Sequence, residues 1–166
     1  MIGLAGKLPA HGDFVRRGGP VAALLTLDRW LDSALASYPS PDEAIDRLDG
    51  WRFAVMLDEG AVIGAIVASH DSVGRRFPLV AILSGSPPGR AAADRWAAAA
   101  LAAMADARDA GTRADDLSAA LDAISRPDAG SDSVASGWWR GDGAPILAGT
   151  GLPDGPAFAR LIGEDG

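Results

Sequence analysis

Hydrophobic residues recur along this chain with two different periods, which predict helices in some segments and strands in others. Over residues 21–38 the large apolar side chains fall three and four positions apart, the spacing of one face of an amphipathic helix. Over residues 51–57 they occupy alternate positions, as in a strand that buries one face. Segments 61–69 and 77–84 are apolar at nearly every position, which favours strands covered on both faces of a sheet.

Capping and stop signals place the other helices. The stretch Ser40-Pro41-Asp42-Glu43 is typical of a capping box, in which Ser40 and Glu43 each accept a hydrogen bond from the other's backbone amide, and it predicts a helix to about Leu48. The Ala-rich segment 90–110 predicts a long helix that Gly111 terminates. Two more helices are expected, one from Thr112-Arg113-Ala114-Asp115 to about residue 125 and a last one over 157–162, capped by Asp154-Gly155-Pro156.

The remaining segments complete the predicted fold. Residues 2–8 are expected to form a strand ended by Pro9, followed by a glycine-rich turn, and Asp58-Glu59-Gly60 predicts a three-residue hairpin loop. Residues 138–140 and 146–148 predict a closing hairpin or two short edge strands, and the polar loop 126–136 is expected to be the most mobile segment. Strands joined by short turns must be antiparallel. We therefore predict one compact α/β (α+β) domain over residues 1–166, with a mostly antiparallel sheet of about five strands flanked by helices.

Composition and charge exclude several functions. The chain has 166 residues, of which 48% are hydrophobic, enough for one domain with a true core. Its net charge of −7 argues against nucleic acid and against anionic membranes as partners. The absence of cysteine excludes disulfides, a cysteine nucleophile and thiolate metal sites. No targeting segment and no apolar stretch of about 20 residues is evident, so a cytoplasmic protein without membrane insertion is expected.

Two phrases carry the candidate chemistry, because each places charged residues beside glycines and prolines at the end of an apolar segment. They are Gly6-Lys7-Leu8-Pro9-Ala10-His11-Gly12-Asp13-Phe14 and Gly74-Arg75-Arg76-Phe77-Pro78-Leu79. One of the two arginines is expected to pair internally with Asp13 or Asp71, leaving the other exposed to meet a carboxylate or a phosphate. The candidate interaction or site-shaping residues are Lys7, His11, Asp13, Arg75 and Arg76.

No catalytic pattern accompanies these residues. The chain has two histidines, His11 and His70, without the spacing of a metal site, and His70-Asp71-Ser72 is a poor triad because neighbours on a strand point to opposite faces. Gly6-Lys7 does not fit a phosphate-binding loop. We predict no catalytic residue, no metal and no cofactor. The alternatives are a small ligand-binding or hydrolase-like domain that uses His11, Asp13 and His70, and a structural homodimer subunit.

The tryptophans favour a buried role. Trp30, Trp51 and Trp96 lie at positions compatible with a core. Trp138 and Trp139 must face opposite sides of a strand, so one of them is either covered by the final helix or exposed as an anchor for a partner. Coverage is the favoured interpretation.

The two phrases resemble the TagF (ImpM) family, accessory proteins of bacterial type VI secretion. Gly6-Lys7-Leu8-Pro9-x-His11-Gly12-Asp13-Phe14-Val15-Arg16-Arg17 is similar to the opening of that family, and Asp71 to Leu79 is similar to its mid-chain motif. The Trp30 helix, the Trp51-x-Phe53 strand, the Trp138-Trp139 pair and Gly151-Leu152-Pro153 with Phe158 follow in the expected order. The resemblance covers nearly the whole chain, although the segment after Gly64 is short of bulky residues.

This resemblance implies regulation rather than catalysis. It implies a compact domain similar to longin or profilin-like modules that acts in the cytoplasm as a post-translational restrainer of secretion. It also implies a forkhead-associated-domain scaffold as partner, beside a threonine kinase and phosphatase pathway. The implied mechanism is occupancy, in which the domain holds its partner and prevents assembly or firing.

Overall fold

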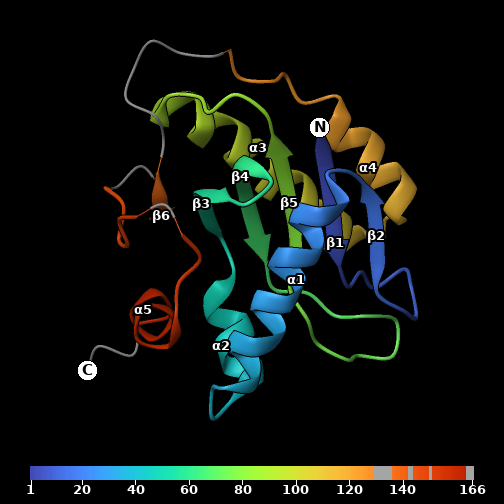
Figure 1. Ribbon diagram of the computed structural model, residues 1–166. Helices are drawn as coiled ribbons and strands as arrows, with labels where there is room; N and C mark the ends of the chain where they lie inside the picture. The colour runs from blue at the N-terminus through green and yellow to red at the C-terminus, as the bar shows by residue number, and fades with distance from the viewer. Residues whose placement is uncertain (129–135, 142–143, 150, 164–166) are drawn as a thin grey trace.

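The computed structural model describes residues 1–128, 136–141, 144–149 and 151–163. Within them the chain forms six strands and five helices in an order that alternates small groups of each (Figure 1). The strands are β1 (Ile2–Gly6), β2 (Val15–Gly18), β3 (Trp51–Leu57), β4 (Gly60–Val67), β5 (Leu79–Ser84) and β6 (Gly137–Trp139). The helices are α1 (Val21–Ala36), α2 (Pro41–Leu48), α3 (Arg90–Ala110), α4 (Ala114–Asp122) and α5 (Gly155–Leu161).

All strands join one sheet in the order β2-β1-β5-β4-β3-β6, and every neighbouring pair is antiparallel. This confirms the predicted compact α+β fold and its antiparallel sheet. The expected strand count was one too low because the β2 segment, four residues between glycines with two arginines among them, was interpreted as a turn. β2 lies at the edge of the sheet, where a short and polar strand is tolerated.

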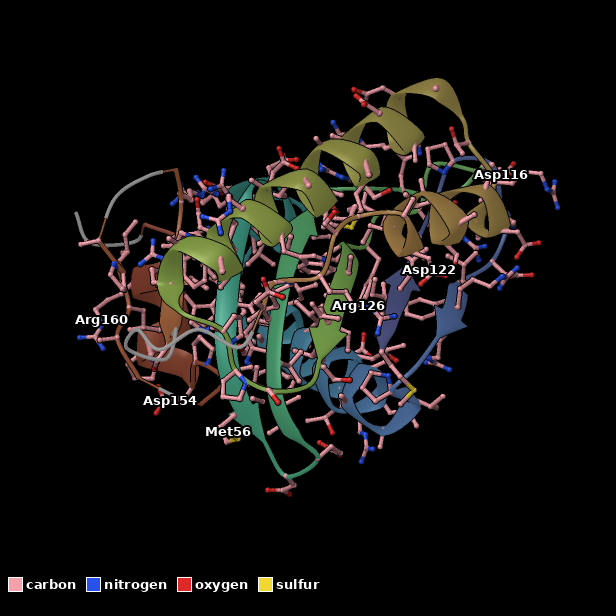
Figure 2. The ribbon with its side chains drawn as sticks, turned by 90° about the horizontal axis from the view of Figure 1, so that it is seen from above. Met56, Asp116, Asp122, Arg126, Asp154 and Arg160 are labelled. Atoms are coloured by element: carbon pink, nitrogen blue, oxygen red, sulfur yellow. The ribbon has the colours of Figure 1, made fainter. Side chains whose placement is uncertain are left out.

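The sheet lies between two layers of helices (Figure 2). Helices α3 and α4 cover one face, and α1, α2 and α5 cover the other. The central strands β4 and β5 are buried along most of their length, as their two-sided apolar sequences predict. Each face therefore has its own apolar core, and the sheet separates the two.

The helix predictions are mostly confirmed, with one correction at α2. α3 has the predicted bounds and ends at Gly111, whose φ of +66° is the left-handed conformation that glycine adopts freely. α2 begins after Ser40 as expected, but the capping box is wrong because Ser40 makes no side-chain cap bond. Glu43 instead pairs with Arg47 one turn further along the helix.

The predicted hairpin between β3 and β4 is present but is one residue tighter. Gly60 pairs with Leu57 as the first residue of β4, so the loop contains only Asp58 and Glu59. Gly60 has a φ of +120°, a backbone conformation that glycine adopts far more readily than other residues.

The closing segment confirms that both adjacent tryptophans are covered. Trp138 and Trp139 of β6 are 1% and 0% exposed, and they contribute to opposite faces of the sheet. The expected strand at 146–148 is reduced to one bridge between Leu147 and Trp138. α5 follows where it was predicted, and the Asp154 carboxylate caps it by accepting a hydrogen bond from the Ala157 amide at 3.2 Å.

Gly64 of β4 gives a first testable prediction. A Cβ at this position would lie 2.8 Å from the Ala81 carbonyl and would overlap the Phe53 ring. We expect Gly64→Ala to lower the free energy of unfolding by about 1–3 kcal/mol, because the packed sheet cannot move to relieve the overlap. Urea denaturation measures the change, and Gly155→Ala, where nothing lies within 4 Å, is the matched control. An equal effect of both substitutions would contradict the packing argument.

Candidate functional site

The two charged phrases of the sequence form adjacent loops at one end of the sheet. One loop, residues 7–14, follows β1, and the other, residues 68–78, joins β4 to β5. Gly6 at the end of β1 pairs with Leu79 at the start of β5, so the strand register brings the loops together (Figure 1). We call residues 7–14 and 68–78 the two-loop surface.

Asp71 is the centre of this surface. Its residue is 1% exposed, and its carboxylate accepts hydrogen bonds from the backbone amides of Val73 at 3.1 Å and Arg75 at 2.9 Å. The same carboxylate pairs with the Arg75 side chain at 2.8 Å and with Lys7 Nζ at 3.2 Å. One buried anion thus holds the backbone of its own loop and ties it to the loop that carries Lys7.

These partners keep Asp71 ionised over a wide pH range. Burial, the largest single influence, would raise the pKa of Asp71. Hydrogen bonds from the Arg75 amide, the Lys7 ammonium, the Arg75 side chain and the Val73 amide together outweigh it and lower the pKa to about 2. The carboxylate is therefore a fixed negative charge at neutral pH. A proton donor or acceptor that works near neutral pH requires a pKa much closer to 7.

Hydrogen bonds to backbone carbonyls join the two loops further. The Ser72 amide donates to the His11 carbonyl at 2.8 Å, and Arg75 Nη2 donates to the Gly12 carbonyl at 2.5 Å. Within the second loop, the Gly74 amide donates to the Asp71 carbonyl at 3.0 Å, and Gly74 has a φ of +86°. The tip at Ser72 and Val73 is therefore held in one conformation by bonds on both of its sides.

His11 supports a helix rather than a reaction. Its Nε2 accepts a hydrogen bond from the Ala114 amide at 2.9 Å and so caps the first turn of α4, a role the sequence did not reveal. The pairing requires the imidazole proton to lie on Nδ1. The other histidine, His70, has its Nδ1 within 3.0 Å of the Asp71 carbonyl.

The alternative site of His11, Asp13 and His70 finds no support in these contacts. The two rings are engaged with different backbone groups, and Asp13 is exposed. No group of three or more potential metal ligands occurs in the described part of the chain.

The two arginines differ from the expectation in one respect. Arg75 forms the internal pair with Asp71, as one of the predicted options had it, although its side chain remains 60% exposed. The other arginine was expected to be exposed, but Arg76 pairs with Asp46 of α2 and its side chain is 31% exposed. That pair lowers the pKa of Asp46 and raises the pKa of Arg76 by hydrogen bonding. The prediction missed Asp46 because nothing in a linear sequence indicates that α2 lies beside residue 76.

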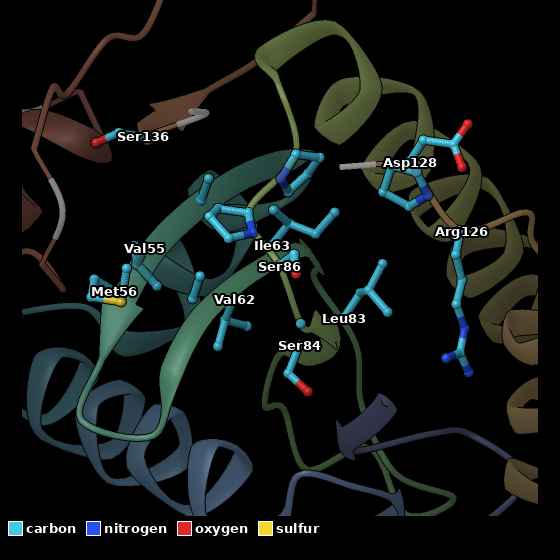
Figure 3. A pocket seen from close by; sticks show the side chains of 16 residues that line it. Val55, Met56, Val62, Ile63, Leu83, Ser84, Ser86, Arg126, Asp128 and Ser136 are labelled. Carbon is cyan, nitrogen blue, oxygen red and sulfur yellow. The ribbon is translucent and has the colours of Figure 1, made fainter. Parts of the chain in front are cut away.

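Two of the hollows in the surface of the described residues bear on the candidate site. One, of about 600 Å³, adjoins the two-loop surface and is lined by polar groups that are already paired, including Arg76 and Arg108. The other, of about 490 Å³, is mainly apolar and lies at the opposite end of the sheet, where Figure 3 shows Met56, Ile63 and Leu83 lining it. The candidate residues from the sequence do not line this apolar hollow.

The protein is a compact α+β domain. The two charged phrases of its sequence form an ordered two-loop surface at one end of the sheet. The sequence model of one family, the TagF N-terminal domain, Type VI secretion system-associated, matches residues 3–124. The chain therefore belongs to this family, which confirms the resemblance found in the sequence.

One solved structure supports the fold. The crystal structure of PA0076 from Pseudomonas aeruginosa PAO1 matches with a TM-score of 0.66 at 23% sequence identity, over 100% of this chain and 96% of that chain. This likeness shows a shared fold. No curated protein sequence matches the chain. Among the described residues, no helix has the length and apolar character needed to cross a membrane.

Proposed function

We propose that this protein is a non-enzymatic regulator of bacterial type VI secretion that represses it after translation by binding a cytoplasmic component. The component that the family resemblance favours is a scaffold with a forkhead-associated domain. Residues 1–166 act as a single TagF-like domain in the cytoplasm, and repression follows from occupancy. The family match to a secretion-associated domain supports the assignment to this system.

The observation that carries the proposal is the construction of the two-loop surface. Lys7 and Arg75 converge on one buried carboxylate, and His11 fixes the first loop to α4. All of these contacts stabilise loop conformation. A binding surface requires such stability, because a loop that is already ordered loses little entropy when its partner arrives. Lys7, His11, Asp13, Arg75 and Arg76 are accordingly proposed as the residues that present or shape the surface.

Co-purification tests the proposal directly. The tagged protein is expressed in its native host at its normal level, and the proteins bound to it are identified by mass spectrometry. We expect a type VI scaffold with a forkhead-associated domain to be recovered, and the double variant Arg75→Ala with Arg76→Ala to lose it while its circular dichroism spectrum is unchanged. The control is Arg29→Ala, since Arg29 lies on α1 outside the two-loop surface and, among the described residues, donates a hydrogen bond to the Leu25 carbonyl alone. Recovery of no secretion protein, or equal recovery by the double variant, would count against the proposal.

Arg76 is expected to contribute little to the stability of the fold, so that a loss of partner binding on its substitution can be attributed to the surface. Its pair with Asp46 joins the second loop to α2 at a partly exposed site, where an ion pair contributes little. We expect Arg76→Ala alone to lower the free energy of unfolding by no more than about 1 kcal/mol, as measured by urea denaturation. Asp46→Ala should give a similar value, and the double variant should show little further loss. A much larger loss for Arg76→Ala would mean that this arginine holds the loop as Asp71 does.

A further inference from the structure

Val73 is the most exposed large apolar side chain in the described part of the protein. It is 71% exposed, and it lies at the tip of the loop between β4 and β5. Its own amide donates to the buried Asp71 carboxylate, so the backbone beneath the exposed side chain is fixed. Single exposed apolar residues are common on protein surfaces and need no explanation by themselves. Val73 differs from such residues because its backbone is held by the buried Asp71, so that the exposed side chain is presented in a fixed position.

Phe14 adds a second apolar group on the neighbouring loop. Its ring is packed edge-on against Phe77, with 5.7 Å between ring centroids, and 37% of the residue is exposed. The Arg16 guanidinium lies 5.5 Å from the Phe14 ring. Phe14 is thus held against the second loop, and it adds aromatic area to the same end of the domain as Val73.

Arg75 supplies a directed polar group beside these apolar side chains. Its Nε and Nη2 donate to Asp71 and Gly12, and within the described residues its Nη1 has no hydrogen-bond acceptor. The guanidinium is therefore held in place while 60% of the side chain faces solvent. A planar cation fixed in this way favours a carboxylate on a partner.

We propose that Val73 and Phe14 are the anchors of this surface, and that they enter an apolar depression on a partner protein whose rim offers a carboxylate to Arg75. The inference rests on the proposed function, and it adds which side chains supply affinity and what the partner's surface must be. Interface hot spots are enriched in aromatic residues and arginine and lie in fully desolvated pockets, and here Phe14 and Arg75 accompany the exposed Val73 on ordered loops. Lys7 and Asp71 are positioning residues in this scheme.

The test uses the purified forkhead-associated scaffold protein of the same bacterium as the probe and isothermal titration calorimetry as the readout. Val73→Asp is expected to weaken binding about tenfold or more, because it would place an unpaired charge in the apolar depression of the partner. Val21→Asp is the matched control, since Val21 is 53% exposed at the start of α1, outside the two-loop surface. The control is expected to bind as the unaltered protein does.

A second measurement does not depend on the Asp variant folding well. The chain has no cysteine, so Val73→Cys and Val21→Cys can each be labelled at a single site with an environment-sensitive fluorophore. We expect the scaffold to shift the emission of the label at position 73 to the blue and to leave the label at position 21 unchanged.

The outcomes separate this inference from the proposed function. Tight binding of the unaltered protein with no change for Val73→Asp, and no shift of the label at position 73, would overturn the anchor assignment and leave the proposed function intact. Absence of any binding by the unaltered protein would overturn both.

Discussion

Asp71→Asn is expected to disorder the two-loop surface and to weaken partner binding at least about tenfold, while the rest of the sheet remains folded. The substitution keeps the shape of the side chain but removes the charge that Lys7 and Arg75 share. Two cations then face each other without the anion between them, and removing one partner from a buried charge cluster is strongly destabilising. The melting temperature should fall by several degrees. Hydrogen exchange of the Val73 and Arg75 amides should accelerate, because both donate to the altered carboxylate.

The same residue predicts a pH dependence. The folded-state pKa of Asp71 is lowered to about 2 from an ordinary value of 3.8, so the folded protein holds this carboxylate ionised more strongly than the unfolded chain does. A lowered pKa contributes stability that is complete above the unfolded value and is lost as the pH falls through the folded value. The contribution should therefore be lost between about pH 4 and pH 2, where Lys7 and Arg75 stay charged. Thermal melting over this range should show a component that Asp71→Asn lacks.

The matched control for both measurements is Asp13→Asn. Asp13 lies in the neighbouring loop and is exposed, so its substitution changes the net charge by the same amount without touching the buried cluster. It should shift the melting temperature little, and because it leaves Asp71, Lys7 and Arg75 in place, the acid-dependent component that Asp71 contributes should remain. If the two variants behaved alike, the Asp71 network would not be what orders the surface.

Much of the fold follows from the sequence because its signals are local. The period of apolar residues located α1, β3 and the two-sided strands β4 and β5, and Gly111 located the end of α3. The predictions that were wrong also have physical reasons. β2 lacks an apolar stripe because an edge strand has only one neighbour and little buried surface. The Ser40 capping box failed on both sides, because Ser40 makes no side-chain cap bond and Glu43 pairs with Arg47 instead.

The sequence named candidate residues that lie close together in the structure, but it did not show how they contact one another. The two phrases named Lys7, His11 and Arg75, and the structure brings all three to one surface. Asp71 was considered as a possible partner of an arginine and as a member of a poor triad, but not as the centre of the site, since a sequence does not show which carboxylate is buried. His11 as a cap for α4 was invisible because its partner amide is 103 residues away. The residues were marked by their neighbours in sequence, but their roles depend on contacts between distant segments.

Trp138→Ala is expected to be the most destabilising single substitution in the apolar core. The Trp138 ring stacks on Phe53 with 4.6 Å between centroids, lies 5.3 Å from the Trp30 ring, and is 1% exposed. Removing a buried tryptophan costs about 3–5 kcal/mol, a large share of the roughly 5–15 kcal/mol that holds a domain folded. Urea denaturation followed by circular dichroism measures the loss.

The effect of Trp138→Ala should extend beyond the cavity that the missing ring leaves. β6 has three residues and one strand neighbour, so side-chain packing must hold it in place as much as its ladder does. Trp30 also packs edge-on against Phe158 of α5, at 5.9 Å between centroids, and donates a hydrogen bond to the Pro153 carbonyl. Loss of Trp138 should therefore loosen α5 as well as β6, and hydrogen exchange in α5 should accelerate.

Trp138→Phe is the matched control, because it keeps an aromatic ring against Phe53 and should retain most of the stability and the slow exchange of α5. Trp139 lies on the other face, where its indole donates to Asp94 at 2.6 Å and Arg90 stacks over its ring at 4.0 Å. Trp139→Ala should accordingly destabilise the α3 side without accelerating exchange in α5. If α5 responded equally to both alanine variants, β6 would couple the two layers. If it responded only to Trp138→Ala, the sheet would separate the two cores in energy as it does in space.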